Sequence, residues 1–195
     1  MNVIIFGAPG AGKGTQSDFI VKKLNLYKLS TGDLLRDEIK KKTNLGVEIT
    51  SVVNSGTLVP DKIINTLIEN IVSNENYKNK IIFDGYPRNL SQAENLNDLL
   101  SKHKQKINLV IRLKVSLDTI KKRITGRMSC SKCGNIYNEF FNPPKKDNNC
   151  CQKEFLKKRE DDNIEVAIKR FKTYEETTEP VLEFYNKMNL VKDIN

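Results

Sequence analysis

The chain has 195 residues, of which 38% are hydrophobic and 29% are charged, and its formal net charge is +9. This length supports one good core and excludes two independent catalytic domains, and the apolar runs are too short to predict a membrane span. The sequence does not open with the basic region and cleavage site of a signal peptide, so we expect a cytoplasmic protein. The positive charge attracts anions, and on this ground alone nucleic acid, anionic lipid and phosphorylated small molecules are all candidate partners.

A strand, a glycine loop and a helix are predicted at the start of the chain. Residues 3–6 are strand-forming, and Lys13 follows among glycines at positions 7, 10, 12 and 14, ahead of a helical pattern over residues 16–24. Such a loop points several backbone N–H groups and the positive end of the helix at a phosphate. The nucleotide-loop signature fits through Lys13, but its hydroxyl comes one position late, at Thr15. We interpret the segment as a phosphate site; the alternative is a turn that only joins strand to helix.

Residues 30–33 supply Ser, Thr and Asp in a helix-start arrangement. Arg36 falls in the early turns of that helix, where its guanidinium and the positive helix end can face one anion together. The alternative is an ordinary surface arginine. Two more helices are predicted, over residues 45–54 and 60–71.

A buried strand over residues 80–83 is predicted to deliver Asp84 and Arg88 into a turn at its carboxyl end. Ligands of open α/β sheets bind outside the carboxyl ends of the strands. An acid at this place in a phosphate-loop protein can hold magnesium directly or through water, whereas the alternative is an Asp that merely ends a strand. For the following helix, Ser91 and Glu94 predict a capping box.

Residues 108–115 predict a third strand, and Ser116 is expected to cap the helix after it. Arg123 and Arg127 are four residues apart, so we expect them on one face of this helix. A shared polyanion would remove the cost of stacking two like charges. A solvated basic face is the alternative.

The four cysteines lie close together in the sequence, which is typical of a local metal site rather than of a disulfide framework. Two residues separate Cys130 from Cys133, and sixteen more separate Cys133 from Cys150, so these three thiolates can bind one metal. Cys151 is adjacent to Cys150, which makes simultaneous binding by both awkward. We predict a structural zinc, with free thiols in a reducing compartment as the alternative.

The sequence Arg-Glu-Asp-Asp at residues 159–162 leads a long helical pattern that bears Arg170 and continues to Tyr174. Pro180 marks a break or kink in the pattern that follows. Residues 189–194 predict one last strand.

Taken together, the glycine loop, residues 30–33, residues 84–88, the arginines at 123 and 127, and residues 159–162 resemble the adenylate kinases over almost the whole chain. The resemblance implies an α/β phosphate-loop nucleoside-monophosphate kinase fold with a parallel sheet flanked by helices. Its expected parts are a core at residues 1–29, 60–126 and 160–195, a helical nucleoside-monophosphate domain at 30–59, and a small lid at 127–159. The implied reaction is reversible and magnesium-dependent: ATP and AMP give two ADP, which maintains adenine nucleotide balance. We expect a monomer without nucleic-acid or membrane partners.

The resemblance also implies which residues bind the two nucleotides. The ATP phosphates and base are expected at Gly10, Ala11, Gly12, Lys13, Gly14, Thr15, Arg123 and Arg127. AMP is expected at Thr31, Arg36, Thr57, Val59, Gly85, Arg88 and Gln92. Arg159 and Arg170 would reach both nucleotides, and Asp84 would hold magnesium through water; with Lys13, Arg88, Arg123 and Arg127 these form the expected catalytic set. Thr31 matches the AMP-specific form, since uridylate and cytidylate kinases usually carry alanine there.

Zinc-bearing members of the family place their fourth ligand three residues after the third, where this chain has Lys153. The ligand set Cys130, Cys133, Cys150 and Cys151 therefore stays open at its fourth place. Two other functions are considered: a kinase that acts on UMP, CMP or GMP, and a zinc-dependent nucleic-acid-binding module. The second leaves Lys13, Asp84 and Arg88 without a role.

Overall fold

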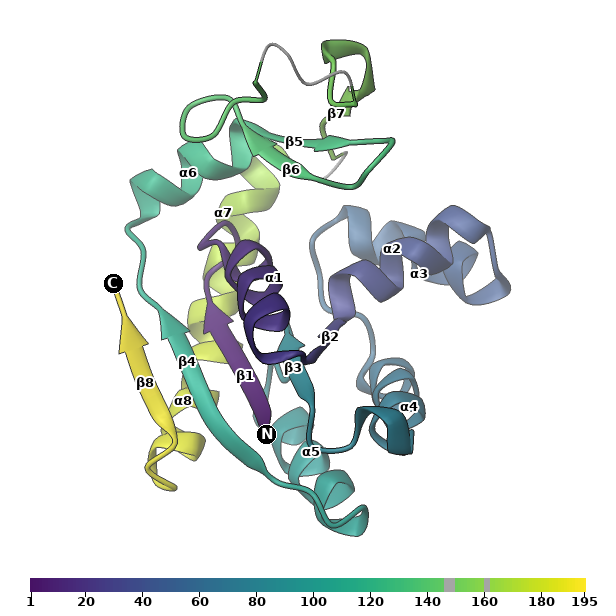
Figure 1. The fold of residues 1–195 in the computed structure, drawn as a ribbon, viewed down its shortest axis with the longest axis vertical. Helices are drawn as coiled ribbons and strands as arrows, with labels where there is room; N and C mark the ends of the chain where they lie inside the picture. Colours follow the sequence, from purple (N-terminus) through teal and green to yellow (C-terminus); the bar gives the residue numbers. More distant parts are fainter. Residues whose placement is uncertain (146–149, 160–161) are drawn as a thin grey trace.

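A five-stranded parallel sheet forms the centre of the molecule in the computed structural model, which describes residues 1–145, 150–159 and 162–195 (Figure 1). Glu160 and Asp161 of the predicted Arg-Glu-Asp-Asp motif, and residues 146–149 of the predicted lid, lie outside the described residues. The strand order is β2-β3-β1-β4-β8, with bounds β1 (Asn2–Gly7), β2 (Tyr27–Ser30), β3 (Ile81–Asp84), β4 (Ile107–Leu113) and β8 (Val191–Ile194).

Helices cover both faces of this sheet because its central strands are apolar on both sides. In β1, Val3 and Ile5 pack toward Ile20 of α1, while Ile4 and Phe6 belong to a larger cluster with α4, α5 and α8. The helices around the sheet are α1 (Lys13–Leu24), α4 (Asp61–Val72), α5 (Leu90–Lys102), α6 (Leu117–Thr125), α7 (Ile164–Thr173) and α8 (Glu179–Asn186). A π-helical turn, Tyr174–Thr178, joins α7 to α8, and a 3₁₀ turn, Glu75–Tyr77, follows α4. The predicted α/β class is confirmed.

Two short helices, α2 (Thr31–Lys41) and α3 (Asn44–Asn54), extend from the carboxyl end of β2. The predicted helix start at residues 30–33 is confirmed, and Ser30 is its cap, because its hydroxyl accepts a hydrogen bond from the Asp33 backbone N–H at 3.3 Å. The two helices pack tightly where Gly46 meets α2: a Cβ there would lie 2.1 Å from the Glu38 carbonyl oxygen. Only glycine permits this close approach.

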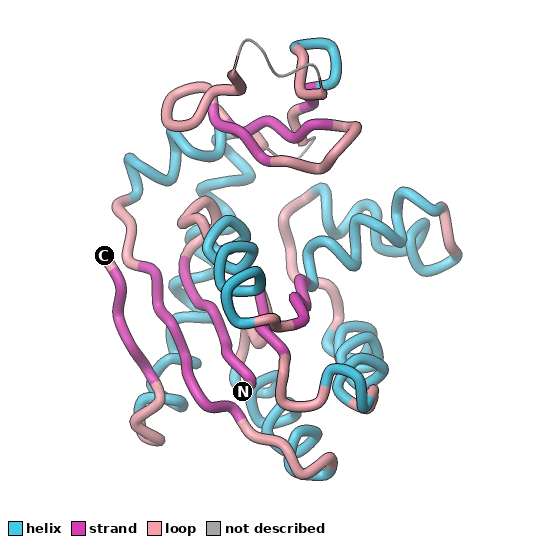
Figure 2. Tube along the Cα trace, viewed as in Figure 1, coloured by secondary structure: helices cyan, strands magenta, loops and turns pink. Residues whose placement is uncertain are grey.

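A separate antiparallel sheet of order β6-β5-β7 lies beyond the carboxyl ends of β1 and β4 (Figure 2). Its strands are β5 (Arg127–Cys130), β6 (Ile136–Asn138) and β7 (Leu156–Lys157), with a 3₁₀ turn, Lys153–Phe155, ahead of β7. Among the described residues, no helix combines the length and apolar character that a membrane span needs.

Two local predictions were wrong, and one strand was missed. The α5 helix is capped by Asn89, whose side chain accepts from the Gln92 N–H at 2.8 Å, so the capping box of Ser91 and Glu94 does not form. Arg127 does not share the helix of Arg123, because α6 ends at Thr125 and Arg127 opens β5. Strand β2 was not predicted, since four residues carry too little periodicity.

Candidate active site

The glycine loop wraps around the Lys13 side chain between β1 and α1. The Lys13 ammonium donates hydrogen bonds to the carbonyl oxygens of Gly7 at 2.6 Å and Ala8 at 3.2 Å. Gly12 has φ +99°, a left-handed conformation that suits glycine, and no side chain caps the N-terminus of α1. The amides of this helix end are therefore free of a side-chain partner, as an anion site requires.

A cavity of about 620 Å³ opens above the loop and is bounded by the central sheet, by α2 and α3, and by the small sheet. Every residue for which a nucleotide-binding or catalytic role was predicted lines it. They are Gly10, Ala11, Gly12, Lys13, Gly14, Thr15, Thr31, Arg36, Thr57, Val59, Asp84, Gly85, Arg88, Gln92, Arg123, Arg127, Arg159 and Arg170.

Arg88 lines the cavity and is fixed by three hydrogen bonds. Its Nε donates to the Gly85 carbonyl at 2.8 Å, its backbone N–H donates to Gln92 Oε1 at 2.7 Å, and its carbonyl accepts from Thr178 Oγ1 at 2.9 Å. Burial, and after it the charge of Arg170, lowers the pKa of Arg88 to about 10. The guanidinium therefore stays charged at neutral pH and is already oriented for a phosphate.

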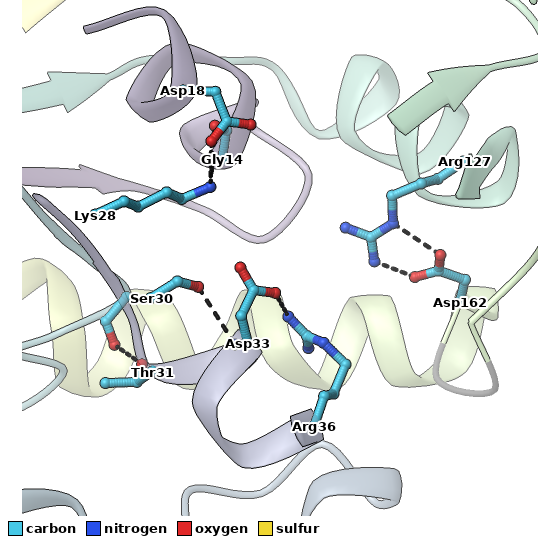
Figure 3. Close-up of polar contacts among 10 residues, drawn as sticks. Gly14, Asp18, Lys28, Ser30, Thr31, Asp33, Arg36, Arg127 and Asp162 are labelled. Atoms are coloured by element: carbon cyan, nitrogen blue, oxygen red, sulfur yellow. Dashed lines mark hydrogen bonds and ion pairs between the residues drawn. The ribbon is translucent and has the colours of Figure 1, made fainter. Parts of the chain in front are cut away.

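Arg123, Arg127 and Arg159 line the same cavity. Arg123 Nη1 donates to the Ala11 carbonyl at 2.8 Å, while Arg127 forms a two-pronged pair with Asp162 (Figure 3). Burial, and then the charge of Arg127, lowers the pKa of Arg159 to about 10. Several cations packed so closely create a strong local field for a polyanion.

Arg36 and Arg170 complete the arginine set. Arg36 pairs with Asp33 at 2.6 Å (Figure 3); burial raises the pKa of Asp33, but the hydrogen bond and charge of Arg36 outweigh it, so the pKa is lowered. Arg170 lies on α7 and donates to the Val53 carbonyl of α3 at 3.2 Å. Arginines from separate elements thus face one cavity.

Asp84 ends β3 inside the cavity and is only 8% exposed. Burial raises the pKa of its carboxyl, against the opposing charges of Lys13 and Lys28. None of the described residues donates a hydrogen bond to this carboxylate. A buried carboxylate without a donor, close enough to Asp33 for the charge of Asp33 to raise its pKa, fits the oxygen ligands that magnesium or its water shell prefers.

The four cysteines lie together outside the cavity. Their Sγ atoms are all within 4.8 Å of one another, and the Sγ atoms of Cys133 and Cys151 are 3.4 Å apart. A tetrahedral zinc with Zn–S bonds of about 2.3 Å holds its sulfurs about 3.8 Å apart, so this cluster fits zinc. The adjacent pair Cys150 and Cys151 thus reaches one point, which spacing alone had made awkward.

Lining residues that were given no role of their own from the sequence include Lys28, Phe141, Asp162 and Thr178. Lys28 stands close to the predicted motif at residues 30–33 and Asp162 ends the one at residues 159–162, and their charge was the available signal. Phe141, whose ring centre is 5.9 Å from the Arg123 guanidinium, and Thr178 carry no sequence signal of their own.

A family model described as "Adenylate kinase" matches residues 5–190 of the chain. The chain belongs to the adenylate kinase family. Relatives named adenylate kinase include a protein of Pelagibacter ubique, 52% identical over 195 residues, which span all of this chain and 92% of that protein. Those of Fusobacterium nucleatum and Pseudothermotoga lettingae are 43% and 40% identical, again over the whole chain and 90% of each relative.

Membership of the adenylate kinase family confirms the resemblance and makes the chain a phosphotransferase, as predicted. A zinc-dependent nucleic-acid-binding module is not favoured, and neither is another nucleoside-monophosphate kinase.

Proposed function

We propose that the chain transfers a phosphoryl group between ATP and AMP, reversibly, to give two ADP. The observation that carries this proposal is the arrangement of six arginines and Lys13 around one cavity. Two nucleotides meeting end to end place a chain of phosphates between them, and such a chain calls for cations on every side.

Charge neutralisation and in-line placement carry the catalysis, because phosphoryl transfer leaves little covalent work for the protein. Lys13 and the loop amides bind the ATP phosphates, and Arg36 and Arg88 bind the AMP phosphate. Arg127, Arg159 and Arg170 surround the group in transfer. Asp84 would hold magnesium through its waters, and the ion would supply positive charge to the ATP phosphates. No Ser, His or Cys nucleophile is needed.

Water must be kept from the phosphoryl group, or ATP is hydrolysed. We assign this role to residues 127–159 as a lid and to residues 30–59 as the nucleoside-monophosphate domain, as the sequence predicts. Arg170 supports the assignment, because it already connects α7 to α3 through the Val53 carbonyl.

Thr31 is proposed to select AMP. Its hydroxyl donates to the Gly85 carbonyl at 2.8 Å, which leaves the hydroxyl oxygen as an acceptor for the amino group of adenine. An alanine at this position offers no such acceptor.

A structural zinc is proposed at Cys130, Cys133, Cys150 and Cys151, supported by the clustering of their sulfurs. Elemental analysis of protein purified without chelator is expected to find about one zinc per chain, and Cys133→Ser is expected to lower the melting temperature. Metal-free protein would contradict the assignment. A cytoplasmic monomer stays our prediction for the whole protein.

The test of the reaction is a coupled assay of ADP formation with AMP, GMP, CMP and UMP as acceptors. We expect AMP to be the best acceptor, and Arg88→Ala to lower turnover about a hundredfold or more. Arg112→Ala is the matched control, since Arg112 pairs with Glu179 and does not line the cavity. A clear preference for a pyrimidine nucleotide would contradict the role of Thr31.

A further inference from the structure

Lys28 lies in the cavity wall, although it belongs to neither the glycine loop nor the arginine set. Only 20% of its side chain is exposed, and its ammonium nitrogen lies 2.8 Å from Asp18 Oδ1. It also donates to the Gly14 carbonyl at 3.4 Å (Figure 3). These two hydrogen bonds hold the positive charge against the first turns of α1 instead of in solvent.

The same charge lies close to the carboxylates of the proposed magnesium site. A Cβ built at Gly14 would lie 3.8 Å from Lys28 Nζ and 3.7 Å from Asp84 Oδ2, so the ammonium and the carboxylate are near neighbours. Burial raises the pKa of Asp84, and the charge of Lys28 is one of those that oppose the rise. Lys28 also acts to lower the pKa of Asp33.

We infer that Lys28 weakens the hold of Asp84 and Asp33 on the divalent cation, so that the phosphates of the nucleotide remain its main ligands. The inference rests on the magnesium role proposed for Asp84. A fixed positive charge beside these carboxylates repels a divalent cation, and the effect is larger in a water-poor cavity than in solution. Lys28 is thus a positioning residue that acts through the carboxylates.

Asp18 adjusts this effect from the other side. Its carboxylate bonds to Lys28 and so offsets part of the ammonium charge, while its side chain is 53% exposed. A purely structural Lys28 would instead serve only to attach β2 to α1. The two roles predict different results: the charge at position 28 controls the cation affinity if Lys28 is a positioning residue, and has no effect on it if Lys28 is purely structural.

Cation affinity is best measured with Mn²⁺, because the electron paramagnetic resonance signal of free Mn²⁺ reports binding directly. The protein is first saturated with two adenosines joined through five phosphates, which occupies both nucleotide positions and prevents turnover. We compare wild type with Lys28→Gln, Lys28→Arg, Asp18→Asn and Asp84→Asn. Melting temperatures of all variants are measured in parallel.

Lys28→Gln is expected to bind Mn²⁺ about threefold to tenfold more tightly than wild type. Lys28→Arg keeps the charge and should restore the wild-type affinity, whereas Asp18→Asn should weaken binding about twofold. Equal affinities of wild type and Lys28→Gln would overturn the inference, as would a gain in Lys28→Arg equal to that in Lys28→Gln.

Asp84→Asn distinguishes a failure of this inference from a failure of the magnesium role proposed for Asp84. Weaker Mn²⁺ binding in Asp84→Asn, with no change in Lys28→Gln, contradicts the role of Lys28 alone. Unchanged binding in Asp84→Asn overturns both the magnesium role and the inference, while ADP formation by wild type still tests the reaction. Should Lys28→Gln fold poorly, Asp18→Asn decides by the direction of its change.

Discussion

The cavity and the outer surface of the molecule carry different cations. Seven of the 33 Lys and Arg residues are arginine, and six of these seven line the cavity. Among the described lysines, only Lys13, Lys28 and Lys114 do so. Arginine presents a planar fork that matches two phosphate oxygens at once, whereas lysine is a flexible point charge. The comparison teaches that the net charge reflects mainly the lysines outside the cavity, whereas the arginines identify the candidate active site.

Replacing a cavity arginine by lysine breaks this comparison most directly. Arg88→Lys keeps the charge but loses the Nε donor that Gly85 orients, so we expect kcat/KM for AMP to fall about a hundredfold. The reverse exchange at an exposed lysine outside the cavity, Lys122→Arg on α6, should leave kcat/KM unchanged. Both are measured by the coupled ADP assay, and near-wild-type activity of Arg88→Lys would mean that charge alone suffices.

Lys13 is one of the three described lysines that line the cavity, and it sharpens the comparison because it belongs to the glycine loop. Burial lowers the pKa of Lys13 to about 8, against the charge of Asp84. The charged form binds phosphate and predominates below this pKa, so ATP affinity should fall about tenfold between pH 7 and pH 9. Calorimetric titration of ATP across this range measures the fall.

The control for this pH dependence is Lys13→Arg, whose guanidinium stays charged up to pH 9. We expect its ATP affinity to be lower than that of wild type at pH 7 but flat over the same range. An equally steep fall in Lys13→Arg would assign the titration to another group.

The smallest expected effect lies outside the cavity, at the start of α5. Asn89 caps this helix, and Asn89→Ala should lower the free energy of unfolding by about 1 kcal/mol. Ser91→Ala, at the position first predicted to form the cap, should change it by less than about 0.5 kcal/mol. Urea unfolding measures both, and an equal loss in the two variants would contradict the observed cap.

Parts of the fold and of the site could be predicted from the sequence, and others could not. The glycine loop and the strands β1, β3 and β4 are recognisable from local sequence patterns, namely glycine spacing and short apolar runs. The sheet and the Lys13 site were therefore predictable. Arg127 was assigned to the wrong element, because helical spacing continues in the sequence past the point where α6 ends. It lines the cavity all the same, because its position in the chain is fixed by the end of α6 next to the loop.

Lys28 and Asp162 could not be given roles from the sequence, for a different reason. Each acts through a partner that the fold alone brings near: Asp18 and the neighbourhood of Asp84 for Lys28, and Arg127 for Asp162. The convergence of sulfurs from adjacent Cys150 and Cys151 likewise depends on the turn that holds them.

A crystal structure of the protein with two adenosines joined through five phosphates tests the central claim most directly. We predict one molecule of this compound in the cavity, with the guanidinium groups of Arg88, Arg127, Arg159 and Arg170 and the Lys13 ammonium within hydrogen-bond distance of its phosphates. Phosphates bound elsewhere, or any two of these arginines directed away from them, would contradict the account.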